Sequence, residues 1–295
     1  MLVSIIIPLH QTNDFFKICL ESALAQTHKK LEIILACNGE LTVEQCKNFT
    51  LIEDKRLVYL KTANGRHNAR NEALEIAKGE WIQFLDYDDY LFPTKIEEQL
   101  IAVLKRKTVG LCICEWKKFT KNINEYYFFP FHDIFDEPLL SSGKLVKKLG
   151  ISGGFIATAS WLVSKELVNG LKWIDSPNDD AVFLSGILKK SPSIVMIPKV
   201  LAGYRIHNDN TSSIQSKEEF DKLMYAWKII HLNLLVLGGR QVHLYFYKAY
   251  LYLILCSKQI KKYRLAELIY YCLLFGFRAK VGLLIFRDLK NKLFK

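Results

Sequence analysis

Three carboxylates lie close together where an apolar run of the sequence ends. The run Trp81–Leu85 is followed by Asp86, Asp88 and Asp89. Carboxylates this close repel one another, but a D-x-D pair at a strand end can bind a divalent cation through its oxygens. Mg²⁺ in particular combines one or two carboxylates with phosphate oxygens. The alternative is an acidic turn that caps a helix beginning near residues 93–94.

Alternating strands and helices surround this cluster. Apolar, β-branched runs predict strands at 2–9, 31–37, 56–62 and 81–86, and amphipathic patterns predict helices at 13–26, 42–50, 66–78 and 94–106. This alternation predicts a parallel sheet with right-handed crossovers. Ligands of such sheets bind outside the carboxyl ends of the strands. The segments 8–10, 37–39 and 86–89 should therefore converge on one edge.

The rest of the chain continues the same pattern and then changes to helices. We predict a strand at 109–116, a helix at 165–170, a polar turn followed by a helix at 176–190, and a strand pair at 194–207. Residues 119–150 are aromatic and irregular, and their pattern predicts no element. From residue 216 the chain is predicted to be helical, with a break at Gly238-Gly239.

The order and spacing of three sequence blocks resemble the family 2 glycosyltransferases of the GT-A fold. The blocks are VSIIIPLHQ, CLESALAQTHKKLEIILACNG and GRHNARNEALEIAKGEWIQFLDYDD. The resemblance is clear over residues 1–105 and looser to residue 215. It implies an α/β fold of GT-A type, a Rossmann-like, mostly parallel sheet flanked by helices. The catalytic domain would span 1–215, followed by a C-terminal helical extension at 216–295.

The resemblance also implies an inverting reaction that uses a nucleotide-sugar donor, with a UDP-sugar expected, and Mn²⁺ or Mg²⁺ as cofactor. Pro8 and His10 match positions that line the nucleoside, and Arg70 matches an Arg near the nucleotide. Asp86 matches the position near the ribose and the metal. Asp88 matches the metal ligand itself.

Three further positions carry open alternatives. Asn38 stands where the family usually has the second Asp of an Asp-Asp pair that contacts the base. It can accept from uracil N3–H or donate to a base acceptor, or it only makes the turn with Gly39. Tyr87 touches the nucleotide through its backbone or is purely structural. His207 matches a position that can complete the metal site, with a simple turn histidine as the alternative.

One carboxylate must also accept the proton of the attacking hydroxyl. Asp180, in Ser176-Pro177-Asn178-Asp179-Asp180, matches the catalytic base of the family. Inversion in one step needs no carboxylate nucleophile. The alternative role of Asp179 or Asp180 is to cap the following helix, and one residue can do both.

The positive charge of the chain is concentrated in its last quarter. Residues 1–220 hold 27 basic and 27 acidic residues, whereas residues 221–295 hold 14 basic and 3 acidic ones and so carry the whole net charge of +11. This tail is also rich in aromatic residues. An anionic membrane surface is its expected partner, and a second subunit, giving a homodimer, is the alternative. Nucleic acid is not expected, because the sequence contains no recognised nucleic-acid-binding module.

The bulk composition agrees with a cytoplasmic enzyme on the inner face of the membrane. The start MLVSIIIPLH has no basic region and no cleavage site, so we interpret it as a strand. The seven cysteines are odd in number and include no CxxC pair, which favours reduced thiols. No run of about 18 uninterrupted apolar residues occurs, so no membrane-spanning helix is expected.

These observations predict a glycosyltransferase that uses a glycan or lipid-linked acceptor in bacterial surface polysaccharide or lipooligosaccharide synthesis. A metal-dependent nucleotidyltransferase would use similar carboxylates, but it more often has a Gly-rich basic loop near the first strand, and IIPLHQTND has none. A catalytically inactive nucleotide-sugar-binding module is the other alternative, and the presence of both Asp88 and Asp180 argues against it.

Overall fold

The computed structural model describes residues 1–106, 110–127, 132–152, 154–190, 192–207 and 214–294. It divides into two compact units. Unit 1 comprises residues 1–140, 156–175 and 192–209, and unit 2 comprises residues 141–155, 176–191 and 210–295. These units differ from the predicted division into residues 1–215 and 216–295, because the segments 141–155 and 176–191 group with the C-terminal helices. The predicted extent of the catalytic domain stays a prediction.

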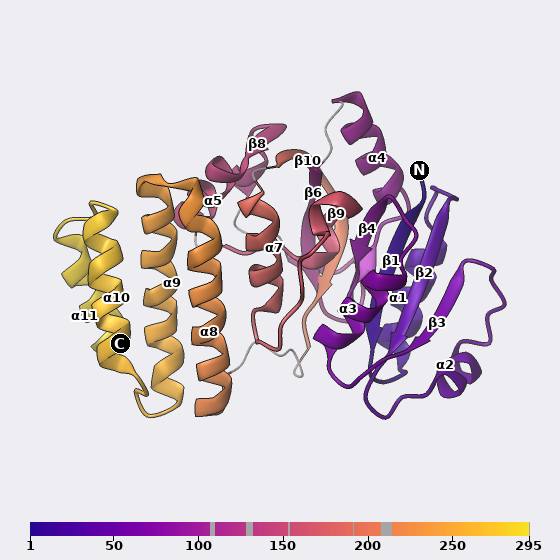
Figure 1. Ribbon diagram of the computed structural model, residues 1–295, viewed down its shortest axis with the longest axis horizontal. Helices are drawn as coiled ribbons and strands as arrows, with labels where there is room; N and C mark the ends of the chain where they lie inside the picture. Colours follow the sequence, from indigo (N-terminus) through magenta and orange to yellow (C-terminus); the bar gives the residue numbers. More distant parts are fainter. Residues whose placement is uncertain (107–109, 128–131, 153, 191, 208–213, 295) are drawn as a thin grey trace. The chain divides into compact units, whose positions relative to one another are not determined.

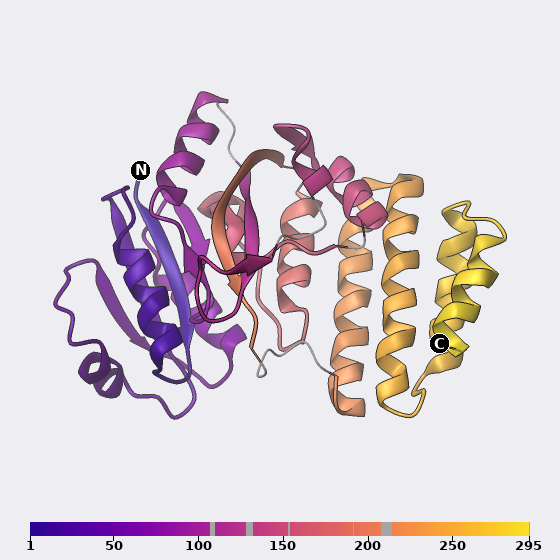
Figure 2. The same ribbon diagram turned by 180° about the vertical axis from the view of Figure 1, so that it is seen from behind.

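Unit 1 is built on one large sheet, which Figures 1 and 2 show from its two sides. The strands follow the order β3-β2-β1-β4-β9-β6-β10-β5. Strands β1, β2, β3 and β4 run parallel, as do β6 and β10, while β9 and β5 run antiparallel to their neighbours. Two short strands lie off this path, β7 on β6 and β8 on β10. The sheet strands are β1 (Val3–Leu9), β2 (Leu31–Cys37), β3 (Leu57–Lys61), β4 (Trp81–Phe84), β5 (Tyr90–Leu91), β6 (Gly110–Phe119), β7 (Tyr126–Tyr127), β8 (Leu139–Ser141), β9 (Trp161–Ser164) and β10 (Ser193–Arg205).

The helices of unit 1 connect these strands, and local sequence signals fix their ends. Asn13 caps the first helix by accepting a hydrogen bond from the Phe16 amide, and Thr42 forms a capping box with Gln45 at the second. Their apolar faces pack on the sheet. The helices are α1 (Asp14–Leu24), α2 (Val43–Thr50), α3 (Arg66–Ile76), α4 (Lys95–Lys105), α6 (Lys165–Val168) and the 3₁₀ turns η1 (His132–Phe135) and η2 (Thr158–Ser160).

One strand prediction was wrong. The segment 194–207 was expected to form a strand pair around Pro198, but it forms the single strand β10. The register of β10 against β6 shifts between Ile197 and Val200 and again between Val200 and Ala202. A bulge of this kind absorbs the irregularity while the ladder continues, so the chain needs no turn there.

Unit 2 is a group of helices with an aromatic core. Helix α9 packs against α5, α8, α10 and α11, and α7 packs against α8. Rings of Phe246, Tyr250 and Phe275 meet at its centre, with the centroids of Phe246 and Phe275 separated by 5.3 Å and those of Tyr250 and Phe275 by 5.5 Å. The elements are α5 (Ser142–Ser152), α7 (Asp179–Lys189), α8 (Lys217–Leu234), η3 (Leu235–Leu237), α9 (Gly239–Gln259), α10 (Leu265–Arg278) and α11 (Leu284–Phe294).

Two expectations from composition can be checked here. All seven cysteines are free, as predicted, and the structure shows in addition that all seven are buried. Within the described ranges, no helix has the length and apolar character needed to cross a membrane.

Candidate active site

The candidate site lies where the order of the sheet reverses. Strand β1 has β2 on one side and β4 on the other, and all three run parallel. Leu85 continues the pairing beyond β4 by donating its amide to the Ile6 carbonyl at 3.0 Å. The segments that follow β1 and β4 therefore emerge at the same edge, at a topological switch point. This confirms that His10 and the carboxylates belong to one edge.

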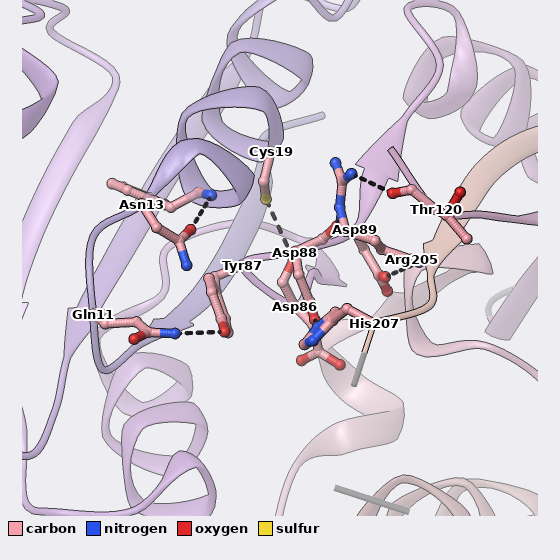
Figure 3. A network of polar contacts seen from close by, with 11 residues as sticks. Gln11, Asn13, Cys19, Asp86, Tyr87, Asp88, Asp89, Thr120, Arg205 and His207 are labelled. Carbon is pink, nitrogen blue, oxygen red and sulfur yellow. Dashed lines mark hydrogen bonds and ion pairs between the residues drawn. The ribbon is translucent and has the colours of Figure 1, made fainter. Parts of the chain in front are cut away.

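Each of the three carboxylates has its own partner, as Figure 3 shows for Asp88 and Asp89. Asp86 forms an ion pair with Arg70 of α3. Asp88 Oδ2 lies 2.7 Å from Nε2 of His207. Asp89 Oδ1 accepts the backbone amide of Arg205 at 3.0 Å. Partners from three different segments thus stabilise a cluster that would otherwise repel itself, and the helix-capping alternative is wrong, since Thr94 is the cap residue of α4.

Arg70 is held in place by a tryptophan that the sequence did not single out. Its buried guanidinium stacks 4.3 Å from the ring centroid of Trp173. Trp173 is itself fixed by Asn71, whose Oδ1 accepts the Trp173 amide at 2.8 Å and whose Nδ2 donates to the Trp173 carbonyl at 3.0 Å. Asp86 remains about one-third exposed, with 32% of its side chain accessible. The arrangement places a buried, fixed cation behind a carboxylate that reaches solvent.

The Asp88–His207 pair is the most enclosed part of the site. Both side chains are only 14% exposed. Burial raises the pKa of Asp88, the nearby Asp86 carboxylate raises it further, and the hydrogen bond from His207 opposes both effects. The ring of Phe15 lies 5.3 Å from that of His207. The fold has therefore brought His207 to Asp88 across 119 residues of sequence.

Asp89 serves the structure of the loop. It is fully buried, and burial, followed by the Asp88 and Asp86 charges, raises the pKa of its carboxyl group well above the usual range. The side chain of Arg205 donates from Nε to the Asp88 carbonyl at 2.7 Å and from Nη1 to the Thr120 carbonyl at 2.8 Å. Its guanidinium also lies 4.6 Å from the Phe15 ring centroid. These contacts tie the acidic loop to the ends of β6 and β10.

The residues expected around the nucleoside lie at the same edge. Pro8 is buried in β1 and pairs with Ala36 of β2. The exposed His10 ring meets Tyr87 edge-on at 5.0 Å. Tyr87 in turn accepts a hydrogen bond at 3.0 Å from Nε2 of Gln11. Partial burial lowers the pKa of His10, and the Asp88 charge opposes this effect.

Asn38 is buried beside the end of β1. Its backbone N–H donates to the Leu9 carbonyl at 2.8 Å, and its side-chain Oδ1 accepts the backbone N–H of Gly65 at 3.3 Å. Gly65 is the cap residue of α3 and has φ +103°, a conformation that favours glycine. The next residue, Gly39, makes the expected turn at φ +62°. Asn38 therefore links β1, β2 and α3, whichever contact it makes with a ligand.

The described residues contain no group of three or more His, Cys, Asp or Glu side chains arranged to hold a metal ion. Asp88 and His207 supply two donors, one oxygen and one imidazole nitrogen, at 2.7 Å from each other. Two protein donors are enough when a bound diphosphate completes the coordination. The donor set fits Mn²⁺ and, less well because of the imidazole, Mg²⁺.

Asp180 belongs to unit 2 and opens α7. The cap residue Asn178 makes no side-chain capping bond. Instead Asp179 Oδ1 accepts the Asp180 amide at 3.0 Å, and Asp180 Oδ1 accepts the Ala181 amide at 2.7 Å. Asp180 also raises the pKa of the buried Tyr245 hydroxyl on α9, after the larger effect of burial. The sequence analysis identified neither Tyr245 nor Arg205. Only the position of Arg205 two residues before His207 could have drawn attention to it.

Comparisons with known proteins identify the family of this chain. The model of the family described as glycosyl transferase family 2 matches residues 4–171. The chain is 30% identical over 223 residues to UDP-Glc:alpha-D-GlcNAc-diphosphoundecaprenol beta-1,3-glucosyltransferase WfaP of Escherichia coli, covering 74% of this chain and 82% of WfaP. It is 26% identical to glycosyltransferase GlyG of Streptococcus pneumoniae serotype 4, covering 78% of each chain.

Solved structures support the fold. The crystal structure of S. aureus TarS 1–349 in complex with UDP-GlcNAc matches 99% of this chain and 80% of that chain, with a TM-score of 0.63 and 15% identity. The predicted fold class, a mostly parallel α/β sheet flanked by helices with a C-terminal helical region, is confirmed. Because the family model covers more than half of the 295 residues and WfaP is similar over most of its length, the chain belongs to glycosyl transferase family 2.

Proposed function

We propose that this glycosyltransferase moves a sugar from a UDP-sugar to a hydroxyl group of a lipid-linked or polysaccharide acceptor, with inversion at the anomeric carbon. The observation that carries the proposal is the edge of the sheet where Arg70–Asp86 and Asp88–His207 lie together. The name of WfaP pairs UDP-Glc with a diphosphoundecaprenol acceptor, and TarS was crystallised with UDP-GlcNAc. Both relatives support a UDP-sugar donor.

The nucleoside would lie against Pro8, His10 and Tyr87. Because Oδ1 of Asn38 already accepts the Gly65 amide, we propose that Asn38 recognises the base by donating from its NH₂ group to a carbonyl oxygen. Uracil offers such acceptors. Arg70 would bind beside the ribose and diphosphate, because its guanidinium is already oriented by Trp173.

Asp88 and His207 would hold Mn²⁺ or Mg²⁺. When bound there, a divalent cation offsets negative charge on the departing diphosphate. The raised pKa of Asp88 fits this role, since a carboxylate that is costly to ionise alone is stabilised by a cation. Asp86, at the solvent edge of the pair, would contact the ribose.

Asp180 would act as the general base. Its carboxylate accepts the proton of the acceptor hydroxyl, the hydroxyl oxygen bonds to the anomeric carbon, and the bond from that carbon to the diphosphate oxygen breaks. One oxygen of Asp180 accepts the Ala181 amide, which orients the carboxylate at the start of α7. We propose no covalent glycosyl-enzyme step, because inversion needs a single displacement.

A lipid-linked acceptor would bring the protein to a membrane. We propose that the C-terminal helices, which carry the net charge of +11, contact an anionic bilayer, and that a second subunit is the competing partner. Peripheral attachment on the cytoplasmic side stays a prediction.

The test is a thermal-shift and calorimetric panel of UDP, UDP-GlcNAc, UDP-Glc and GDP, each with Mn²⁺ or with EDTA. We expect UDP compounds to bind with metal and to bind much less with EDTA. Asp88→Ala should abolish the metal dependence, while Glu75→Ala, an exposed carboxylate in the same unit, should leave it unchanged. Equal metal-independent affinity in wild type and Asp88→Ala would refute the metal site, and preference for GDP would refute the assignment of the base.

Turnover tests the base separately. Asp180→Asn should lower turnover by roughly 10²–10⁴-fold with little change in UDP affinity, because only the proton acceptor is lost. Near-normal turnover of this variant would remove Asp180 from the mechanism.

A further inference from the structure

Two helix corners of unit 2 lie side by side. One corner joins α8 to α9 and the other joins α10 to α11. Arg240, at the start of α9, donates from Nε to the Ala279 carbonyl at 2.6 Å and from Nη2 to the Lys280 carbonyl at 3.4 Å. Both corners are at the upper end of the helical group in Figure 1, and the α9–α10 corner is at the opposite end. We call the paired corners, residues 235–240 and 277–290, the corner surface.

Large apolar side chains are exposed on the corner surface. Leu283 is 84% exposed and Val236 is 61% exposed. Four other side chains there are between 44% and 59% exposed, namely Leu235, Phe277, Leu284 and Phe286. Such a concentration is uncommon on a protein surface that faces only water.

These side chains are not needed to hold the helices together. A different set, the buried Ile285 and Leu289, packs α11 against the unit. Ile285 approaches α10 at Gly276, where an added Cβ would lie 2.7 Å from Cδ1 of Ile285. Helix α11 therefore has a filled apolar contact on its inner side, and Phe286 is left outward.

Basic side chains surround the apolar ones. Residues 235–240 and 277–290 contain five basic residues, and all five are exposed, namely Arg240, Arg278, Lys280, Arg287 and Lys290. They contain one acidic residue, Asp288, which accepts a hydrogen bond from the Tyr247 hydroxyl at 2.8 Å. The surface therefore carries a net positive charge that complements an anionic partner.

The α9–α10 corner, at the opposite end of the helical group, lacks the exposed apolar side chains of the corner surface. The α9–α10 corner is also basic, with exposed Lys261 and Lys262. No large apolar side chain between residues 253 and 269, a stretch that the structure describes fully, is exposed. The combination of exposed apolar and basic side chains therefore distinguishes one end from the other.

We propose that the corner surface is the site that docks this protein on an anionic phospholipid bilayer. Leu283 and Phe286 would enter the boundary between headgroups and acyl chains, while Arg278, Lys280 and their neighbours bind lipid phosphates. A bilayer fits better than a protein groove because the apolar side chains stand on projecting corners amid positive charge. The inference locates the membrane contact proposed above, and it does not depend on which sugar is transferred.

The test is sedimentation of the full chain with vesicles of phosphatidylglycerol and phosphatidylcholine in equal parts, compared with phosphatidylcholine alone. The wild type should bind the anionic vesicles and be partly released by high salt, because charge is screened and apolar insertion is not. Leu283→Asp/Phe286→Asp should lose at least tenfold in binding. The matched control Ile101→Asp/Leu104→Asp changes two side chains that are each 58% exposed on α4 and should bind like the wild type.

A second pair of variants tests the charges. Arg278→Gln/Lys280→Gln should weaken binding, by roughly fivefold for each basic residue lost, whereas Lys261→Gln/Lys262→Gln at the opposite corner should weaken it less. Equal losses at the two corners would overturn the assignment, as would a wild-type chain that ignores anionic vesicles at low salt.

Two further measurements keep the outcomes separate. Helical circular dichroism measured on every variant shows that its helices are folded, and a wild-type chain that binds UDP but not vesicles would refute the docking surface without touching the proposed function. Analytical ultracentrifugation shows whether Leu283→Asp/Phe286→Asp dissociates a dimer. A dimer lost in this way would assign the corner surface to a second subunit and overturn the membrane inference.

Discussion

A buried lysine connects the strand that leads to the acidic cluster with the stability of the sheet. Lys95, at the start of α4, is completely buried. Its Nζ donates to Oε1 of Gln83 on β4, to Oε1 of Gln99 at 2.5 Å and to the Trp161 carbonyl at 3.0 Å. Gln99 also donates to the Cys112 carbonyl at 3.2 Å. This network joins α4 to β4, β6 and β9, and β4 is the strand whose end carries the carboxylates.

All three acceptors of Lys95 are neutral, so no ion pair offsets the loss of hydration. Burial accordingly lowers the pKa of Lys95 from 10.5 to about 8. Between these two pH values the unfolded chain holds a proton that the folded chain has released. The free energy of unfolding therefore rises with pH, and the penalty for the buried charge is complete below pH 8 and absent above pH 10.5.

The size of the expected change in the free energy of unfolding follows from the pKa shift of Lys95. The full penalty is about 3 kcal/mol, and about 2 kcal/mol of it should be regained between pH 7.5 and 9.5. The assay is urea unfolding of the wild type and Lys95→Met at several pH values across this range. In Lys95→Met the free energy of unfolding should not rise in this way with pH. Its value at any one pH also reflects the three oxygen acceptors that lose the Lys95 donor.

Lys105→Met is the control, because this lysine lies on the same helix and is exposed. It should keep the same dependence on pH as the wild type. If Lys95→Met also retains the full rise, then Lys95 is not the group responsible and the reasoning from its burial is refuted.

Three other predictions test contacts near the site and in unit 2. Arg70→Lys keeps a charge but loses the planar stack on Trp173, so UDP affinity measured by calorimetry should fall roughly tenfold; unchanged affinity would show that Arg70 does not face the nucleotide. Asn38→Ala removes the acceptor of the Gly65 amide just before α3, and chemical denaturation should show a loss of about 1 kcal/mol; an unchanged free energy of unfolding would contradict a stabilising role of this contact. Tyr247→Phe removes a buried hydrogen bond to a carboxylate of α11 and should cost about 1–3 kcal/mol. Hydrogen exchange should then be faster in α11, and equal protection in both proteins would count against this contact.

The sequence was sufficient for most of the elements of residues 1–106 and for the edge at which the candidate site lies, but not for the elements between residues 119 and 150. Buried strands such as Val3–Leu9 and the cap at Asn13 are encoded by neighbouring residues, because apolar runs and side-chain caps act over a few positions. Parallel strands that alternate with helices end at the same edge of a sheet, so the segments after β1 and β4 could be placed at one edge. The order of the strands came only from the structure. The family resemblance rested on the same blocks and was confirmed over residues 4–171.

Only the tertiary structure decided which partners the functional side chains have. Asp88 meets His207 and Arg70 stacks on Trp173 because separate loops end at one place. Asp88 and His207 are 119 positions apart in the sequence, and no local signal predicts that meeting. The burial of Lys95 was hidden as well, since a lysine near the start of a helix is usually solvated. Helices and strands depend mainly on residues that are neighbours in the sequence, so the sequence alone predicted them. Side-chain contacts across the sheet depend on how whole elements pack, so only the tertiary structure showed them.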